Sequence, residues 1–450
     1  MTRAFLCLAL AAFTVAAQQP AAQQPVSPQP AAQQPELPPE LTLSQALNIA
    51  LSNSINIRTA LARLEQATGQ YAENRAPLLP QLYVSAHQNY QTVNLIGLGI
   101  PIATETGKIG PFASMDARVF LSQELLNFSK IRAWKSYRSR EQASRLLSDN
   151  AREVVALNVI AGYLDALRAK ATRDTLAAET KLANDLYRIT RDRVSQGVSA
   201  ELDANRSMQQ VNALEQQRQE AEQSYIAAKL NLANILQAHV TSAYEVSDPT
   251  AYGTGNAPDR DATLKTALAT RSDYQSLEAS VQAAELQVRS VKASRLPSLR
   301  LEFDDGQSGT TPSHNVNTYT LQGVIEFPIY TGGRTKGEIE EAQGALREAR
   351  TALDENRSQI ETDVLTAISG VEWALKEVET SSGNVKLSRQ EVDLTVSRFT
   401  QGISDNTEVV NAQVRLSQAD DANIRAQYAL GLARADLARA MGAAEKTYRR

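Results

Sequence analysis

The stretch that decides the fold is IETDVLTAISGVEWALKEVETSSGNVKLSRQEVDLTVSRFTQG, residues 360–402. Large apolar residues recur in it every seven positions, at Val364, Val371, Val378, Val385, Val392 and Phe399. Mostly small residues hold the second seam position, at Ile360, Ala367, Ala374, Ser381, Ser388 and Thr395. A strict seven-residue repeat makes packed helices supercoil left-handedly, and small side chains let them approach closely. We therefore predict a long coiled-coil helix.

The predicted helix extends beyond this stretch, from about Thr335 to Gln401. At about 1.5 Å per residue it would be roughly 100 Å long, which no ordinary globular core requires. An equivalent helix is expected at about residues 131–196, although its heptads are less regular. Both helices end at a Gln-Gly pair, and glycine permits the left-handed conformation that stops a helix. A partner helix should run back from each turn, which makes two antiparallel hairpins.

The chain repeats its own plan once. Three pairs of segments carry the repeat: RVSQGVS (193–199) with RFTQGIS (398–404), SQELLNFSK (122–130) with EFPIYTGGR (326–334), and APLLPQL (76–82) with SRLPSL (294–299). Each half reads helix, two strands, very long helix, tight turn and helix. We assign residues 41–243 to the first structural repeat and 263–443 to the second. Residues 244–262 are then the linker between the halves, and 444–450 a C-terminal tail.

The N-terminal region is expected to lie outside the fold. Arg3 precedes an apolar run at residues 4–15 and a small-residue end, so residues 1–17 are interpreted as a secretory signal peptide. The run is too short to span a bilayer, which takes about 20 residues. Residues 18–40 are rich in Pro, Ala and Gln and should be disordered, serving either as a spacer or simply as a tail.

Composition narrows the possible functions. The 450 residues carry a net charge of −4, with 46 Lys and Arg against 50 Asp and Glu, which argues against a nucleic-acid partner. Three scattered His and the single Cys7 argue against a Cys or His metal cluster. The acidic residues lie in mixed-sign runs typical of solvated helix faces, and no nucleotide-binding or nucleophile motif is present. We therefore expect no cofactor and no enzyme activity.

Four short segments have a strand-like pattern. After Pro80 and Pro297 the apolar period changes from helical to two, with alternation at residues 82–87, 113–122, 299–304 and 318–327. This predicts a sheet with one apolar and one polar face, which could be an ordinary half-buried sheet. The pattern of the third strand is weak, because its alternation stops at Asp305-Gly306.

The long helices favour a membrane setting for these strands. Exposed strand edges are not tolerated in hydrocarbon, where nothing can pair with the backbone groups. Four strands are too few for a barrel, since eight is about the smallest practical number. Three copies of four strands would supply 12, with the polar faces lining a lumen and the apolar faces contacting lipid. We therefore predict a cyclic homotrimer of mainly α chains, each with four transmembrane β-strands and two long antiparallel coiled-coil hairpins.

The residues also carry a family resemblance. The TLSQALNIAL opening, the LP turns into strands, the FPIYTGGR strand exit and the RxxxG hairpin tips resemble the TolC-like outer-membrane efflux family. The resemblance covers roughly residues 41–442. It implies a 12-stranded barrel among outer-membrane lipid of a Gram-negative-type bacterium, continued by a periplasmic α-barrel built from the helical hairpins. This duct would be the passive exit of a tripartite efflux or type I secretion system. It also implies docking to a periplasmic adaptor (membrane fusion) protein and an inner-membrane transporter of the RND or ABC type.

The resemblance suggests two groups of site residues at the helical end. The adaptor-docking tips would be Gly197, Val198, Ser199, Gly402, Ile403 and Ser404. Many relatives narrow the pore with paired aspartates in a VDVLDA-like pattern, where this chain reads TEVVNA at 407–412. The pore constriction candidates are therefore Glu408, Asp405 and the uncharged Asn411. Asp405 and Glu408 also fit plain helix capping, so both interpretations stay open.

Other features leave alternatives. The lumen charges of the barrel would be Asp116, Arg118, Arg300 and Glu302, either tuning selectivity or simply keeping water in the pore. The apolar loop at residues 94–110 would fold over the barrel mouth or contact lipopolysaccharide. The cargo, whether drug, metal, lipid or protein, is left open. The alternative function is a soluble periplasmic coiled-coil spacer, which would lack bilayer-facing strands.

Overall fold

The computed structural model describes residues 35–96, 99, 108–241, 243–248, 252, 257–311 and 314–449. The expected signal peptide lies outside the described residues, as do most of the segment 18–40 and parts of the loop 94–110 and the linker 244–262. Within the described ranges, no helix combines the length and apolarity that are needed to span a bilayer.

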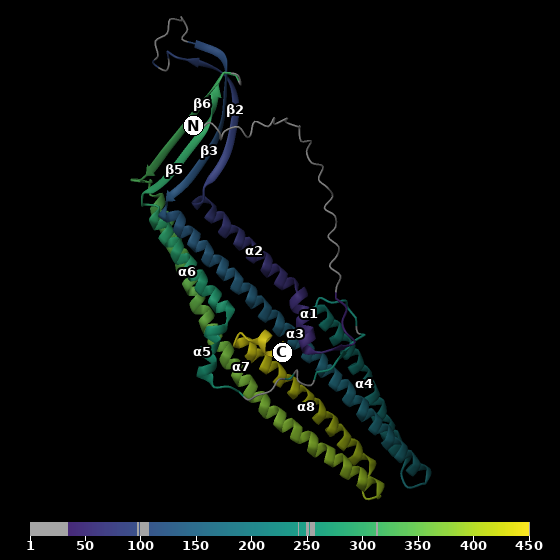
Figure 1. Ribbon diagram of the computed structural model, residues 1–450. Helices are drawn as coiled ribbons and strands as arrows, with labels where there is room; N and C mark the ends of the chain where they lie inside the picture. The colour runs from purple at the N-terminus through teal and green to yellow at the C-terminus, as the bar shows by residue number, and fades with distance from the viewer. Residues whose placement is uncertain are drawn as a thin grey trace, which may run out of the picture.

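The molecule is elongated, with its strands at one end and two helical hairpins at the other (Figure 1). The first repeat comprises α1 (Leu43–Asn53), α2 (Ile55–Arg75), η1 (Ala76–Leu78), β2 (Gln81–Asn94), β3 (Lys108–Leu126), α3 (Phe128–Ser195) and α4 (Glu201–Ile235). The second comprises α5 (Arg260–Thr270), α6 (Ser272–Ala293), β5 (Ser298–Gly309), β6 (Asn315–Glu326), α7 (Arg334–Thr400) and α8 (Asn406–Ala440). Three short elements lie outside this pattern: β1 (Glu40–Leu41), β4 (Glu245–Val246) and α9 (Ala444–Tyr448).

The predicted long helices and hairpins are confirmed. α3 has 68 residues and α7 has 67, and both continue without interruption from the sheet to the far end of the molecule (Figure 1). α4 and α8 run back along them, and each has 35 residues. We call α3–α4 the first hairpin and α7–α8 the second hairpin.

Each repeat opens with two helices, where the sequence predicted one. The first break is at Ser54, between α1 and α2, and the second at Arg271, between α5 and α6. Arg271 has extended backbone angles, and Ser54, with φ −55° and ψ 127°, also lies outside the helical region. The break between α1 and α2 follows from tertiary packing. α1 buries Leu43 and Leu47 in the hydrophobic core that it shares with α3 and α4, while α2 continues along α3 toward the sheet.

The four long strands form one antiparallel sheet in the order β2-β3-β5-β6, and β3 and β5 join the two repeats. β5 continues through Asp305 and Gly306 to Gly309, so the expectation that the third strand weakens there is wrong. Gly306 pairs with Arg118 on one side and Thr318 on the other. A Cβ on Gly306 would lie only 2.4 Å from Cγ of Arg118, so the missing side chain makes room for the arginine without ending the strand.

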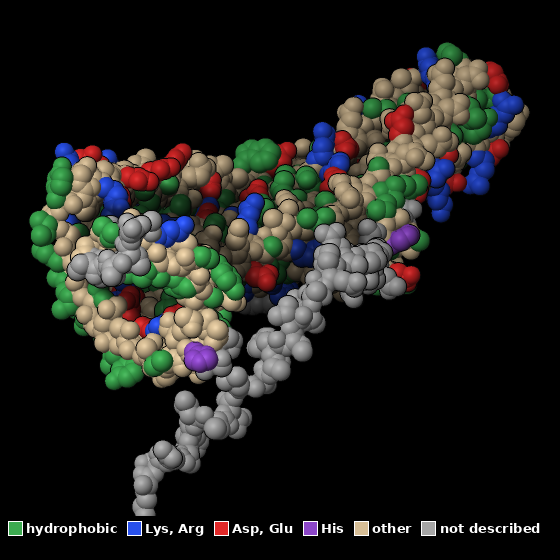
Figure 2. All heavy atoms as spheres, turned by 90° about the horizontal axis from the view of Figure 1, so that it is seen from above, with side chains coloured by type: hydrophobic (Ala, Val, Ile, Leu, Met, Phe, Trp, Pro, Cys, Tyr) green, Lys and Arg blue, Asp and Glu red, His purple; other side chains and the backbone are tan. Residues whose placement is uncertain are grey.

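The pairing register sorts the side chains of the sheet onto two faces. Leu121, Phe303 and Leu321 are opposite one another and share the apolar face, as the alternation predicted. This face is uncovered in the single chain, since Leu321 is 63% and Ile325 74% exposed. From above, hydrophobic side chains gather along the outer edge of the molecule on the left of the view (Figure 2).

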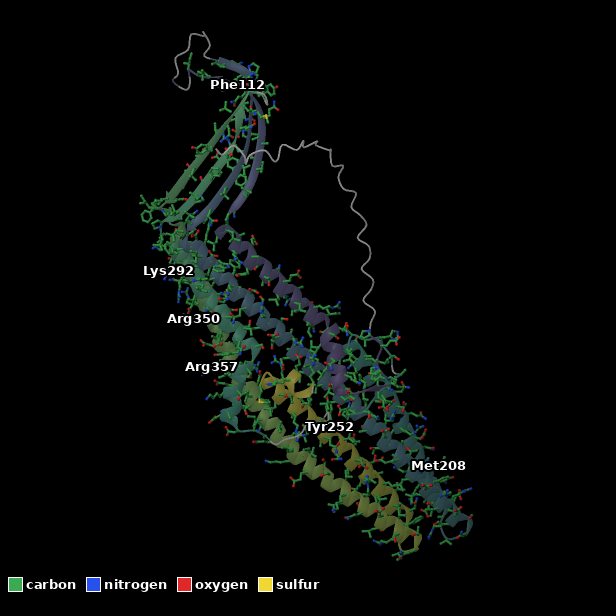
Figure 3. All side chains as sticks on the ribbon, in the orientation of Figure 1. Phe112, Met208, Tyr252, Lys292, Arg350 and Arg357 are labelled. Atoms are coloured by element: carbon green, nitrogen blue, oxygen red, sulfur yellow. The ribbon has the colours of Figure 1, made fainter. Side chains whose placement is uncertain are left out.

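The two hairpins are held together side by side. α3 packs against α6 and α2 near the sheet, and against α4 and α8 further along. α7 packs against α6 and then against α8. One long edge of the molecule is therefore formed by α7, which carries Arg350 and Arg357. The opposite edge is formed by α2 near the sheet and by α4, which carries Met208, toward the tips (Figure 3).

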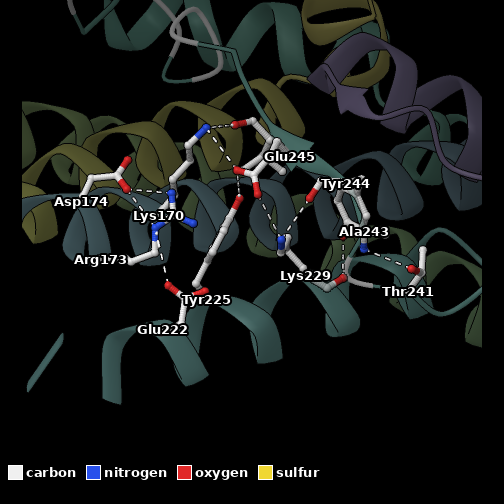
Figure 4. A network of polar contacts seen from close by, with 11 residues as sticks. Lys170, Arg173, Asp174, Glu222, Tyr225, Lys229, Thr241, Ala243, Tyr244 and Glu245 are labelled. Atoms are coloured by element: carbon white, nitrogen blue, oxygen red, sulfur yellow. Dashed lines mark hydrogen bonds and ion pairs between the residues drawn. The ribbon is translucent and has the colours of Figure 1, made fainter. Parts of the chain in front are cut away.

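A network of polar contacts between α3, α4 and β4 holds the chain in place where the first repeat ends (Figure 4). Lys229 of α4 has a side chain only 8% exposed and donates to Oε1 of Glu245 in β4 at 3.2 Å. The Tyr225 hydroxyl donates to Oε2 of the same carboxylate at 2.8 Å, and Lys170 of α3 donates to the backbone carbonyl of Val246 at 2.8 Å. These contacts hold β4 against both helices of the first hairpin.

Candidate functional site

The two hairpin tips have the same local structure. Gly197 and Gly402 adopt φ values of 74° and 76°, the left-handed conformation expected from the Gln-Gly pairs. The backbone N–H of Val198 donates to the carbonyl of Arg193 at 2.9 Å, and that of Ile403 donates to the carbonyl of Arg398 at 2.9 Å. This pattern ends both long helices in the same way.

The predicted tip residues differ in exposure. Val198 is 60% exposed and Ile403 64% exposed, so each tip presents one large apolar side chain to solvent. Ser199 and Ser404 follow them and are half-buried. The Ser199 hydroxyl accepts a hydrogen bond from Nε of Arg193 at 3.4 Å. The valine and the isoleucine are therefore accessible apolar contact points of the two tips.

A contact between the tips was not predicted from the sequence. The guanidinium of Arg193 in α3 donates to the backbone carbonyl of Thr400 in α7 at 3.0 Å. It also lies over the ring of Phe399, 4.9 Å from the ring centroid, in a cation–π arrangement. Arg193 therefore joins the ends of the two longest helices.

A second set of contacts lies just above the tips. Asn406, only 2% exposed, donates from Nδ2 to the carbonyl of Asp203 and to the hydroxyl of Ser207, both at 2.9 Å. Arg206 donates to the Thr407 hydroxyl at 3.2 Å. The contacts of Asn406 are therefore buried or half-buried and that of Arg206 is exposed, and together they link α4 to α8 and fix the two hairpins in register.

Asp405 and Glu408 have different roles in the structure. Oδ1 of Asp405 accepts hydrogen bonds from the backbone N–H groups of Thr407 at 3.0 Å and Glu408 at 3.1 Å, so Asp405 is the N-cap of α8. The Glu408 carboxylate instead lies 3.9 Å from the guanidinium of Arg398. Of the two acids, Asp405 is the one engaged in capping, and Glu408 is exposed.

Glu408 and Asn411 lie together in a groove of about 660 Å³ on the second hairpin. We call it the second-hairpin groove, and its lining comes from both helices: Leu387, Gln390, Glu391, Leu394, Thr395, Arg398, Glu408, Asn411 and Arg415. Inside it, Arg415 pairs with Glu391 at 2.6 Å. The charges of the groove are thus mostly matched within the chain, while its two leucines remain uncovered.

The predicted lumen charges share the polar face of the sheet and are paired. Arg118 donates to Asp116 at 2.8 Å and to Asp304 at 2.7 Å. Arg300 lies 2.7 Å from Glu302 on the same face. The sequence did not single out Asp304, because its link to Arg118 depends on the pairing of β3 with β5. This face of the sheet is therefore strongly polar, and its arginines are balanced by neighbouring carboxylates.

An acidic cluster between the hairpins was also missed. Both carboxylate oxygens of Glu179 in α3 are buried. Burial raises the pKa of Glu179, a hydrogen bond from the Ser417 hydroxyl of α8 lowers it in part, and the negative charges of Asp420 and Asp421 on α8 raise it further. A carboxylate therefore lies at the seam between the hairpins, where its ionisation disfavours their contact.

Among the described residues, no group of three or more His, Cys, Asp or Glu side chains is arranged to hold a metal ion.

The arrangement of an exposed apolar strand face, a polar inner face and long paired hairpins defines a class of protein. Residues 46–237 and 263–443 match the family model described as outer membrane efflux protein, and the chain belongs to this family. The protein is an outer-membrane exit duct of an efflux system. The alternative of a soluble periplasmic spacer is therefore wrong, because the strands belong to the outer membrane.

The similar proteins are outer-membrane export proteins and channels. The chain is 24% identical over 404 residues to the pyoverdine export outer membrane protein OpmQ of Pseudomonas putida, covering 89% of this chain and 85% of that protein. Among solved structures, VceC of Vibrio cholerae aligns with a TM-score of 0.76 at 18% identity, covering 89% of this chain and 96% of VceC. The MtrE channel of Neisseria gonorrhoeae aligns with a TM-score of 0.73 at 20% identity, covering 91% and 90%.

Proposed function

We propose that three copies of the chain assemble into one closed duct. The observation that carries this proposal is the open four-stranded sheet, whose edge strands are β2 and β6 and whose apolar face is exposed. Three such sheets would supply twelve strands, enough to close a barrel and satisfy every strand edge in lipid. The hairpins would then continue the barrel as a helical tube through the periplasm.

The duct would conduct its cargo without a reaction of its own. Its lumen would be lined by the polar face of the sheet, where Arg118 is balanced by Asp116 and Asp304. A wall of matched charges holds water and favours neither sign strongly, which suits passage of varied solutes. The energy for export would come from an inner-membrane transporter of the RND or ABC type. Residues 1–17 would direct the chain through the inner membrane.

We place adaptor docking at the hairpin tips. Val198 and Ile403 are exposed apolar side chains at equivalent turns, so both tips offer the same kind of contact to a periplasmic adaptor. Opening would be a separation of the tips, a change of packing rather than of chemistry. Glu408 would form a single acidic ring near the narrow end, with the uncharged Asn411 one helical turn further along.

Photocrosslinking in cells tests the docking. A photoreactive amino acid would be placed at Val198 or Ile403, at their neighbours Ser199 and Ser404, and, as a control, at the exposed Ser382 of α7. Mass spectrometry of the tip products should identify a periplasmic adaptor, whereas Ser382 should not capture it. Capture of only the chain itself at every tip position, with normal expression, would show that the tips are not the docking site.

A further inference from the structure

The two helix breaks lie at equivalent positions of the repeats. α1 and α5 both contain 11 residues, and Ser54 and Arg271 follow them directly. The backbone N–H of Ser54 donates to the carbonyl of Ala50 at 2.8 Å, and that of Arg271 donates to the carbonyl of Ala267 at 3.0 Å. Ser54 and Arg271 are therefore counterparts, and residues of the opening helices correspond at a shift of 217 positions.

The hairpins correspond at a shift of 205 positions. α4 begins at Glu201 and α8 at Asn406, and each contains 35 residues. Gln237 after α4 and Gly442 after α8 are counterparts at this shift, and both have left-handed backbone angles, with φ values of 54° and 66°. The place where an opening helix meets a hairpin can therefore be compared residue by residue between the repeats.

In the second repeat, charged side chains fill the space between the helix break and the hairpin. Arg271 is 5% exposed and donates to Oδ2 of Asp273 at 2.6 Å and to Oδ2 of Asp363 at 2.9 Å. Asp273 belongs to α6 and Asp363 to α7, so the guanidinium bridges the two helices. One arginine and two carboxylates therefore occupy this part of the second repeat.

In the first repeat the same place is an open pocket of about 570 Å³, lined by the start of α2, by α3 and by the end of α4. We call it the first-repeat pocket. Its lining includes the counterparts of the charged network: Ser54 of Arg271, Asn56 of Asp273 and Asn158 of Asp363. A short hydroxyl and two carboxamides thus stand where the second repeat has an arginine and two carboxylates. The exchange leaves space and removes charge.

The first-repeat pocket offers unpaired carboxamides. Four exposed asparagines line it, and their side chains make no hydrogen bond with any other described residue: Asn56, Asn158, Asn231 and Asn234. Among its described lining residues only Asp165 is charged, and Asp165 pairs with Arg168 at 2.8 Å. Because each carboxamide both donates and accepts, the pocket suits a neutral ligand rich in hydrogen-bonding groups rather than an ion.

Apolar side chains lie beside these carboxamides. Ile55 of α2 is 53% exposed. Ile235 at the end of α4 lies against the backbone of α3 at Gly162, where an added Cβ would be 2.7 Å from its Cδ1. An acetamido group has the same two parts, since its amide matches a carboxamide and its methyl group matches an apolar side chain. Sugar hydroxyls both donate and accept, as carboxamides do.

We infer that the first-repeat pocket binds a neutral glycan made of N-acetylated sugars, a function that goes beyond the proposed duct. The volume of the pocket falls within the range of small-molecule sites. A charged ligand would find no free opposite charge among the described lining residues. A peptide is usually held as a strand added to a sheet edge or by apolar anchors in a groove. The pocket is lined by helices and by four asparagines, which favours the sugar.

Isothermal titration calorimetry tests the inference with the N-acetylglucosamine trimer as the probe. The intact protein would be purified in a detergent without a sugar headgroup, so that the detergent does not compete. The trimer should bind, and its acetyl methyl protons should receive strong saturation transfer from the protein in NMR spectra. The glucose trimer lacks the acetamido groups and should bind about tenfold more weakly. No binding of the N-acetylated trimer, or equal affinity for both sugars, would overturn the inference.

A variant that refills the pocket tests the location of the site. S54R/N56D/N158D copies the arginine and the two aspartates of the second repeat, and it should weaken binding of the N-acetylated trimer by about tenfold or more. Its unfolding temperature should be no lower than that of the native protein, because the introduced charges can pair as those of Arg271 do. A refilled protein that is folded and binds with native affinity would overturn the inference.

A second variant makes the test independent of whether the refilled protein folds. Asn158→Ala/Asn231→Ala removes two carboxamides from exposed helix positions and should also weaken binding about tenfold. Asn212→Ala, at an exposed asparagine of α4 outside the pocket, is the matched control and should bind like the native protein. Equal affinity of the double variant and the control would contradict the inference. Binding of an acetyl-capped alanine tripeptide in place of the sugar would show a peptide site instead.

Discussion

Arg193 of α3 donates a hydrogen bond to the backbone carbonyl of Thr400 in α7 at 3.0 Å, which joins the first hairpin to the second at the tips. The same guanidinium lies over the ring of Phe399, so one side chain makes both a polar and an aromatic contact with the second hairpin. Because both contacts cross between hairpins, Arg193 holds the tips together directly.

Arg193→Ala should therefore loosen the tips. The loss of one hydrogen bond and one cation–π contact amounts to about 1–2 kcal/mol, enough to raise the open fraction several-fold. Single-channel recording in planar bilayers should show a higher conductance or more frequent openings. Arg191→Ala is the matched control, because Arg191 pairs with Glu201 within its own hairpin at 2.8 Å. Equal conductance of the two variants would show that Arg193 does not restrain the tips.

Glu408→Ala should weaken an acidic constriction. Three carboxylates near the axis would attract cations, so their removal should lower the preference for cations or raise conductance. Asn411→Asp should act oppositely by adding a second acidic tier. Asp405→Asn is the control, because an asparagine retains the cap of α8. If reversal potentials and conductance are unchanged in both Glu408→Ala and Asn411→Asp, Glu408 is not part of the constriction.

Arg271→Met should destabilise the second repeat. Arg271 is 5% exposed and pairs with Asp273 at 2.6 Å and with Asp363 at 2.9 Å. Removing the cation leaves a largely buried aspartate unpaired, which costs about 3–5 kcal/mol. Thermal unfolding in detergent should show the loss. Arg350→Met removes a more exposed arginine, paired with Glu285 at 2.7 Å, and should change the transition far less.

The same pair predicts a pH dependence. Burial tends to raise the pKa of Asp273, but the hydrogen bonds and charge of Arg271 outweigh it and hold this pKa below its usual value. The stabilisation is therefore fully present above the usual pKa of an aspartate and is lost as the pH falls through the lower folded-state value. The unfolding temperature of the native protein should drop over that acidic range. If the unfolding temperature of Arg271→Met falls by the same amount over this pH range, the pH dependence comes from other groups.

Glu179→Gln should strengthen the contact between the hairpins at neutral pH. The raised pKa of Glu179, caused first by burial, means that the folded state binds the proton more tightly than the unfolded state. Stability is thus lost as the pH rises from the usual value through the raised one, and the neutral glutamine avoids this loss. The variant should melt higher than the native protein at neutral pH and similarly below the usual glutamate pKa. Asp174→Asn, at an exposed acid on the same helix, serves as the control.

The sequence predicted the features that depend on local pattern. The heptads gave α7 almost to the residue, and the Gln-Gly pairs located both turns, because these signals depend on neighbours within a few positions. The breaks at Ser54 and Arg271 were missed for the opposite reason. Arg271 is held by Asp363, 92 residues away, and no local pattern records that contact.

In the sheet and the tips, too, the features that were missed depend on contacts between residues far apart in the sequence. Gly306 was interpreted as the end of an alternation, whereas the glycine accommodates Arg118 from the neighbouring strand. The capping pattern proposed Asp405 and Glu408 together, and only the folded backbone shows that Asp405 caps α8 while Glu408 faces the second-hairpin groove. Asn406 and Arg193 were missed because their partners lie in the other repeat.

The open edges of the sheet also set the order of events when the protein is made. A lone chain can finish its helices in water, where their backbone groups are satisfied internally. Its sheet cannot be stable in the membrane alone, because the outer edges of β2 and β6 carry backbone N–H and C=O groups with which lipid cannot form hydrogen bonds. In the proposed three-copy assembly, integration into the bilayer would therefore coincide with the meeting of the copies. A substitution that weakens hairpin pairing far from the lipid should then appear as a defect in membrane biogenesis.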